Sequence, residues 1–315
     1  MPFVFAFAFA FALAIGVPMA HAGSEPAASP LVVVLGVAQD AGYPQAGCLK
    51  GCCAPAWSDP SLRRHAASLG IVDPVSGERW LIDATPALPE QLYALDQHTP
   101  SRRGEAPDGV LLTHAHIGHY TGLIHLGREV MGAQAVPLYA MPRMASFLSD
   151  NGPWEQLVQI ENVSLQPLVS GQPVQLSPRV TVTPLAVPHR DEYSETVGYI
   201  VTGPARSILW LPDIDKWERW SVPLEDMLAR VDRAYLDGTF FDGDELPGRD
   251  MAEIPHPFIV ESLRRLDDAP LALREKVRFI HLNHSNPALQ PGSEAAGHVR
   301  AAGMGVAAQG EVYTL

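Results

Sequence analysis

Short apolar runs alternate with turn-rich loops along nearly the whole chain beyond residue 30. We predict strands over the runs of strand length, which are residues 30–36, 66–72, 79–85, 109–113, 180–187, 198–202, 207–211, 233–236 and 277–282. Residues 86–97 are predicted to be helical because Leu88, Leu92 and Leu95 fall on one face. A second helix is expected to run to about Gly127. Strands mixed with helices predict an α/β fold.

The predicted strands share a polar ending. At or just beyond their carboxyl ends stand histidines or aspartates, which are Asp83, His114, His116, His119, His189, Asp213, Asp237 and His284. In α/β folds, the loops at strand ends are where functional sites are usually built. We therefore expect these side chains to meet at one edge of the fold.

The first 22 residues have the pattern of a targeting segment. Residues 1–20 are almost wholly apolar, and Ala20-His21-Ala22 is a small-residue cleavage site. We predict a signal peptide over residues 1–22 cleaved after Ala22, a flexible lead-in over residues 23–30, and one domain over residues 31–315. An uncleaved membrane anchor is the alternative, since the apolar run has about the length of a short spanning helix. Either interpretation predicts an exported domain, periplasmic or secreted.

The net charge of the chain limits the classes of binding partner that we expect. The chain has 315 residues with 22 Lys and Arg against 35 Asp and Glu, a net charge of −13. An acidic surface argues against general binding to nucleic acid or anionic membranes, and a small-molecule substrate is favoured. No membrane span is expected after signal cleavage. The oligomeric state is not indicated by the sequence.

Thr113-His114-Ala115-His116-Ile117-Gly118-His119 carries the strongest chemical signal. Three histidines stand within six residues, directly after a predicted strand. Imidazole is the commonest protein ligand for transition metals, and three imidazoles can leave a zinc position open for water.

Three cysteines, Cys48, Cys52 and Cys53, share one short loop. An odd number excludes complete pairing within the chain. They form a metal clip, or one strained or short-range disulfide and a thiol, or free buried thiols, and the residues alone leave these alternatives open.

Taken together, these motifs resemble the metallo-β-lactamase superfamily, from about residue 31 to residue 315. Within it, residues 35–44, 187–199 and 281–287 are similar to the PqqB-like branch. The resemblance implies an αββα sandwich, in which two sheets pack face to face with helices outside. Some relatives in this branch hold a structural zinc with closely spaced cysteines.

The resemblance also implies roles for the strand-end residues. His114, His116 and His189 would form a first metal site, and His119 and His284 a second. Asp213 would bridge the two, while Asp83 would orient the histidine loop without binding metal. Asp213, or Asp191 and Glu192 after His189, would assist with proton transfer, and the sequence leaves this choice open. The superfamily pattern is His-x-His-x-Asp-His, whereas this chain has Gly118 in place of the carboxylate. The second site is therefore expected to be weakened.

The function expected from these residues is metal-assisted hydrolysis. A metal-bound hydroxide would attack an ester, lactone, amide or phosphodiester, with one or two Zn²⁺ ions and with Fe or Mn as alternatives. His256, between two prolines, is a candidate substrate contact. The competing hypotheses are a non-catalytic or accessory PqqB-like protein linked to pyrroloquinoline quinone biosynthesis or transport, and a di-iron oxidoreductase.

Overall fold

Two mixed β-sheets form the centre of the protein. The computed structural model describes residues 1–4 and 28–315, so the predicted cleavage site and most of the predicted signal peptide lie outside the described residues. Within residues 28–315, each sheet has seven strands, in the orders β14-β1-β2-β3-β4-β5-β6 and β13-β12-β11-β10-β9-β8-β7. The strands are β1 (Leu31–Gly36), β2 (Ser68–Asp73), β3 (Glu78–Ile82), β4 (Gly109–Leu111), β5 (Val136–Ala140), β6 (Val163–Pro167), β7 (Val174–Ser177), β8 (Val180–Ala186), β9 (Val197–Thr202), β10 (Ser207–Leu211), β11 (Arg233–Asp237), β12 (Val277–Ile280), β13 (Gly305–Val306) and β14 (Val312–Thr314).

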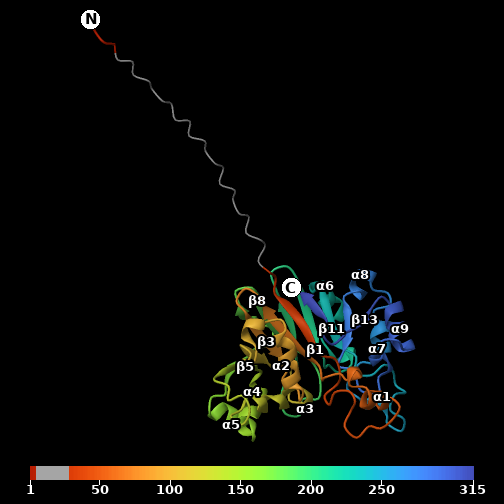
Figure 1. The fold of residues 1–315 in the computed structure, drawn as a ribbon. Coiled ribbons are helices and arrows are strands. Elements are labelled where there is room, and N and C mark those ends of the chain that lie inside the picture. Colours follow the sequence, from red (N-terminus) through yellow and green to blue (C-terminus); the bar gives the residue numbers. More distant parts are fainter. Residues whose placement is uncertain (5–27) are drawn as a thin grey trace.

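Helices cover the outer faces of both sheets. In Figure 1, α2, α4 and α5 lie on one side of the molecule and α6 to α9 on the other. The α-helices are α1 (Ala54–Ser58), α2 (Leu88–Asp96), α3 (Ile117–Tyr120), α4 (Pro142–Asp150), α5 (Trp154–Gln159), α6 (Leu224–Arg230), α7 (Ile259–Arg265), α8 (Leu271–Arg274) and α9 (Glu294–Ala301). The 3₁₀ helices are η1 (Pro60–Leu62), η2 (Pro100–Arg102), η3 (Thr121–Leu126), η4 (Trp217–Arg219), η5 (Met251–Glu253) and η6 (Pro287–Leu289).

The continuous apolar strands are explained by burial on both faces of each sheet. In β1, Val32 and Val34 pack in the core between the sheets, while Val33 and Leu35 pack in the core that includes Leu92 of α2. Such strands lack the alternation of a half-exposed sheet. The αββα sandwich is therefore confirmed.

Strand direction brings the polar strand ends together. Strands β3 and β4 are parallel, and so are β10, β11 and β12. Their carboxyl ends therefore lie at the same edge of their sheets, where α/β folds form their sites. A backbone bridge from Ala38 to Leu282 joins the two halves of the chain at this edge.

Two details differ from the sequence prediction. The helix expected after the histidine motif is the short α3 followed by η3, not one continuous α-helix. Strand β12 ends at Ile280, whereas the strand predicted from the sequence continues to residue 282. This second difference changes which histidine enters the site.

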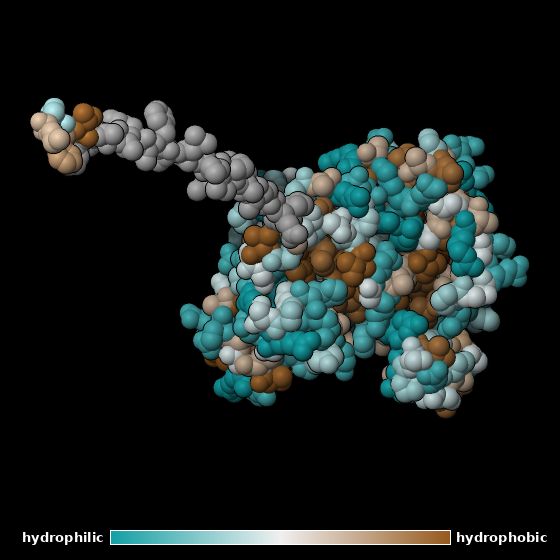
Figure 2. Space-filling view, turned by 45° about the horizontal axis from the view of Figure 1, so that its top comes forward, coloured by the Kyte–Doolittle hydropathy of each residue, from teal (hydrophilic) through white to brown (hydrophobic). Residues whose placement is uncertain are grey.

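One face of the molecule is mainly polar. Figure 2 shows hydrophilic residues over most of one face, with hydrophobic residues gathered in a few patches. In the described part of the chain, no helix has both the length and the apolar character needed to cross a bilayer.

Candidate metal centre

A first group of imidazoles forms where β4 and β8 end. His114 and His116 follow β4, and His189 follows β8. The Nε2 atom of His114 lies 2.8 Å from Nδ1 of His116. The ring of His189 faces both, with centroid distances of 5.4 Å and 5.1 Å. The structure thus brings together the three histidines predicted for the first metal site.

A second group lies beside the first and contains one unexpected histidine and one unexpected carboxylate. The Nε2 atoms of His119 and His281 lie 3.1 Å and 3.2 Å from Oδ2 of Asp213. They also lie 3.3 Å and 3.8 Å from Oδ1 of Asp40. His284, which the sequence prediction assigned to this group, lies elsewhere. Because β12 ends at Ile280, His281 is the first residue beyond the strand, and its ring enters the site.

Asp213 lies between the two groups. Its Oδ1 atom is 3.6 Å from Nε2 of His189, and its Oδ2 atom is 4.0 Å from Nε2 of His114. The carboxylate is therefore within reach of both groups, in the position expected of a bridging ligand.

The chemistry of these atoms fits a transition metal. Among residues 28–315, four buried atoms make no hydrogen bond of acceptable geometry although they converge, namely Asp40 Oδ1, His119 Nε2, Asp213 Oδ2 and His281 Nε2. Both ring nitrogens of His189 share this property. Buried polar atoms are normally satisfied, and nitrogen and carboxylate donors that converge without hydrogen bonds suit a cation such as Zn²⁺.

The outer nitrogen of each ring in these groups, apart from His189, is held by a neighbouring oxygen. Thr113 Oγ1 lies 3.0 Å from Nδ1 of His114, and Thr239 Oγ1 lies 2.9 Å from Nδ1 of His281. Glu192 lies 3.1 Å from Nε2 of His116. Asp83 is wholly buried and lies 2.7 Å from Nδ1 of His119, as expected for a residue that orients the histidine loop. These contacts fix the ring orientations and aim the inner nitrogens into the site.

Two backbone positions at the site lie in the left-handed region. Asp83 has φ 68° and His281 has φ 64°. This conformation is uncommon for residues other than glycine and is concentrated at functional sites. At both positions it turns the chain immediately after a strand.

Burial sets the protonation of the first group. It lowers the pKa of His189 to about 4 and lowers the pKa of His114 well below its usual value. Both imidazoles are therefore neutral at neutral pH, the form that binds metal. Burial raises the pKa of Asp213, but the neighbouring histidines, His281 foremost, outweigh burial and hold that pKa well below its usual range. Asp213 is therefore ionised.

His256 lies at the border between the metal centre and a cavity. Its Nδ1 atom is 2.7 Å from Asp237 Oδ2 and 3.7 Å from Asp213 Oδ1. The cavity has a volume of about 390 Å³ and is lined by His256, Phe240, Arg190 and Arg249, with other polar and apolar residues. The predicted substrate contact is thus placed where a small molecule could reach the metal centre.

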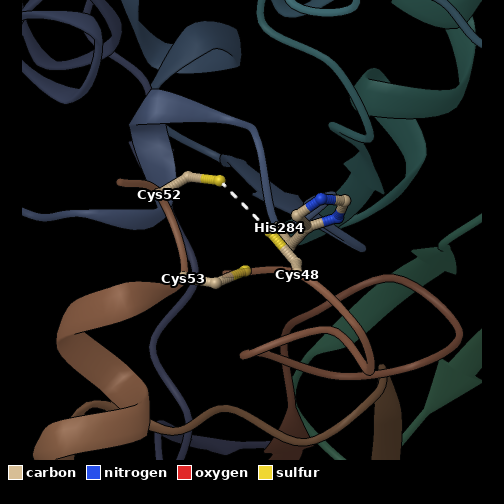
Figure 3. A group of neighbouring side chains, drawn as sticks. All are labelled: Cys48, Cys52, Cys53 and His284. Carbon is tan, nitrogen blue, oxygen red and sulfur yellow. Dashed lines mark hydrogen bonds between the residues drawn. The ribbon is translucent and has the colours of Figure 1, made fainter. Parts of the chain in front are cut away.

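The three cysteines form a separate group with His284. Figure 3 shows the thiols of Cys48, Cys52 and Cys53 directed toward a shared space beside the His284 ring. The four ligand atoms lie within 4.8 Å of one another. Cys48 Sγ and Cys52 Sγ are 3.7 Å apart, well beyond the bond length of about 2.05 Å for a disulfide. Three sulfurs and one ring nitrogen are the ligand set of a closed structural zinc site.

The sequence does not place Asp40, His281 or Glu192 among the residues that would bind the metal or orient its ligands. The signal for His281 was present in the motif His281-Leu282-Asn283-His284, which offers two histidines. For Asp40, the only local signal was its place in a loop directly after a strand. Glu192 is one of the residues expected to assist with proton transfer after His189, but its contact with His116 spans 76 residues and no local pattern indicates it.

Comparisons with known proteins identify the family of this chain. A family model described as a beta-lactamase superfamily domain matches residues 78–282. Coenzyme PQQ synthesis protein B of Methylobacterium nodulans is 31% identical, over 90% of this chain and 99% of that protein. The protein of the same name from Methylorubrum extorquens strain PA1 is 28% identical, over 89% of this chain and 98% of that protein.

Solved structures show the same fold. Zn²⁺-bound PqqB from Methylobacterium extorquens superposes with a TM-score of 0.73 at 25% identity, over 90% of this chain and all of that one. A diphosphatase from the PhnP family gives a TM-score of 0.64 at 24% identity, over 91% of this chain and 97% of that one. The chain therefore belongs to the beta-lactamase superfamily, and within it is a metallo-β-lactamase-fold, PqqB-like protein.

Proposed function

We propose that this protein is an exported metal-dependent hydrolase of a small molecule. One observation carries the proposal. Two adjacent groups of metal-binding side chains share Asp213, and they adjoin a cavity of about 390 Å³ that His256 borders. Paired sites of this kind are typical of hydrolases that act on carbonyl or phosphoryl centres.

Different residues of the chain would hold the metal ions, orient the histidine rings and transfer protons. Divalent ions bound by the two groups would polarise the scissile bond and lower the pKa of a water molecule. Asp213 holds the groups at a fixed separation, and Glu192 and Asp83 fix the rings of His116 and His119. His256, held by Asp237, is placed to donate or accept a proton at the cavity wall.

The cavity lining carries two arginines and two acidic residues, so it suits a charged or polar substrate. Arg190 and Arg249 line it beside the metal centre, and Phe240 supplies an apolar wall. A guanidinium group binds carboxylate and phosphate oxygens with two parallel hydrogen bonds. Asp250 and Glu253 line the same cavity, so it is polar rather than uniformly positive. A charged phosphodiester or a carboxylate-bearing ester or lactone suits this lining better than a neutral apolar ester.

The experiment uses the full mature chain loaded with zinc. We expect hydrolysis of bis(p-nitrophenyl) phosphate or of a carboxylate-bearing lactone, with slower hydrolysis of neutral p-nitrophenyl acetate. His116→Ala removes a ligand of the first group and should abolish turnover. Arg190→Gln should raise KM for the charged substrate and leave KM for the neutral ester unchanged. If the zinc-, iron- and manganese-loaded forms all fail to hydrolyse any of these compounds, the hydrolase proposal is wrong.

Export rests on the sequence of residues 1–22 alone. We infer cleavage after Ala22, which predicts a mature chain starting at Gly23. Amino-terminal sequencing of the protein from a periplasmic extract tests this. An intact Met1 in a membrane fraction would instead support the anchor alternative.

A second candidate function follows from the relatives. Proteins named coenzyme PQQ synthesis protein B match nearly the whole chain at 28–31% identity. An accessory role connected with that quinone cofactor would use the same metal centre without hydrolysis. Binding of pyrroloquinoline quinone by the loaded protein, measured by calorimetry in the absence of turnover, would favour this candidate over the first.

A further inference from the structure

We infer that Asp40 is the carboxylate ligand of the second metal position, and that Gly118 is glycine because Asp40 occupies the space its side chain would need. This deepens the proposed function and rests on the metal centre described above. It also changes the expectation from the sequence, in which Gly118 left the second position with the bridging Asp213 as its sole carboxylate.

The position of Asp40 is fixed by the backbone on both sides of it. Leu282 donates from its amide to the carbonyl of Val37 at 2.9 Å and accepts from the amide of Gln39 at 2.8 Å. The Asn283 side chain donates to Gln39 Oε1 at 2.7 Å. The segment before Asp40 is thus tied to the segment that carries His281. Gly42, with φ 75°, closes the turn by donating to the carbonyl of Gln39.

The Asp40 side chain points into the second group. Its Oδ1 atom is buried, makes no hydrogen bond of acceptable geometry among the described residues, and lies within 4 Å of His119 and His281. Asp213 approaches the same two nitrogens from the other side. Two imidazole nitrogens and two carboxylate oxygens make a four-donor set suited to a divalent transition metal.

Position 118 has no room for a side chain. A Cβ atom at Gly118 would lie 2.3 Å from Cα and 2.4 Å from Oδ1 of Asp40. The first of these is a clash with backbone, which a rotamer change cannot relieve. The backbone at Asp40 therefore excludes a side chain at position 118, so a carboxylate for the second group has to come from another segment. The loop after β1 supplies it here.

The test measures bound metal, independently of turnover. Full mature protein and its variants are equilibrated with a zinc buffer and analysed for zinc per chain, and Co²⁺-loaded forms are compared by their d–d absorption. We expect three zinc ions in the wild type, including one at the cysteine group. Asp40→Asn keeps the shape and removes the charge, so it should bind zinc at the second position at least about 10²-fold more weakly and change the cobalt spectrum. Asp59→Asn, also between β1 and β2, is the matched control, because the Asp59 carboxylate accepts from the Ser61 amide at the start of η1 and belongs to neither metal group.

A stability measurement guards against simple loss of folding. Gly118→Asp should clash with the backbone at Asp40 and unfold at a lower temperature than the wild type. Metal-free Asp40→Asn should unfold at about the temperature of the metal-free wild type, so its loss of zinc would reflect the lost ligand and not a lost fold. Full zinc retention in Asp40→Asn, with an unchanged cobalt spectrum, overturns the inference. If metal binding follows the expected pattern but no compound is hydrolysed, the hydrolase proposal fails while the role of Asp40 stands.

Discussion

The Nδ1 atom of His119 lies 2.7 Å from Oδ2 of Asp83, a residue 36 positions earlier in the chain. The same carboxylate accepts from the amide of Thr113 at 2.8 Å and from its hydroxyl at 2.9 Å. Asp83 is wholly buried, so it joins the end of β3 to the histidine loop after β4. Burial lowers the pKa of His119, but the charge of Asp83, together with Asp213 and Asp40, outweighs burial and raises that pKa well above its usual value.

Asp83→Asn should weaken metal binding without removing a ligand. The amide fits the same space but cannot accept as strongly from the ring, so the orientation and basicity of His119 are lost. We expect the zinc affinity of the second position to fall about 10- to 100-fold. Competition with a chromogenic chelator measures this. Unchanged affinity in a folded Asp83→Asn protein would show that Asp83 serves stability only.

His281 and His284 stand three residues apart but belong to different groups. His281 faces Asp213, whereas His284 lies with the cysteines. We expect His281→Ala to lose turnover and one zinc ion from the histidine centre while the melting temperature changes little. His284→Ala should lose the zinc ion of the cysteine group and unfold at a lower temperature while retaining turnover, because closed zinc sites stabilise folding. Metal analysis together with thermal unfolding separates the two, and a reversed pattern would return His284 to the position predicted from the sequence.

The fold was predictable because the apolar runs are buried on both faces and end in polar residues. The first metal group was predictable for the same reason, since His114, His116 and His189 follow strands directly. The prediction of the second group depended on where β12 ends. The strand ends two residues earlier than predicted, so His281 enters the site in place of His284. Asp40 could not be placed, because the backbone contact between Gln39 and Leu282 joins segments 243 residues apart and no local pattern encodes it.

Asp73 joins the two sheets, and its titration makes the free energy of unfolding depend on pH in the acid range. It lies at the end of β2 and accepts from Arg179 and Ser177 of the second half of the chain. Burial raises the pKa of Asp73, but these hydrogen bonds outweigh burial and lower the pKa to about 2. The folded pKa lies below the unfolded value of about 3.8, so this stabilisation is complete above pH 4 and is lost as the pH falls toward 2.

Asp73→Asn should therefore cost about 2 kcal/mol or more at pH 6, because Arg179 loses its partner. The difference between wild type and variant should shrink between pH 4 and pH 2. Urea unfolding of both proteins at matched pH values measures this difference, which cancels any effect of metal release common to both. A difference that stays constant with pH would show that the ion pair does not titrate in this range.

We expect His256 to act in catalysis and not in metal binding. Asp237 is wholly buried and accepts from Nδ1 of His256 and from the amides of Ile214 and Thr239. It therefore fixes His256 relative to the loop of Asp213 at the cavity wall. His256→Gln keeps a polar group in this space but cannot transfer a proton. We expect kcat to fall about 10²-fold, while KM and the zinc content change little. Asp237→Asn should give a smaller fall in kcat, since the ring remains but is less firmly held. A loss of zinc from His256→Gln would instead identify His256 as a metal ligand, and a rise in KM at constant kcat would limit it to substrate binding.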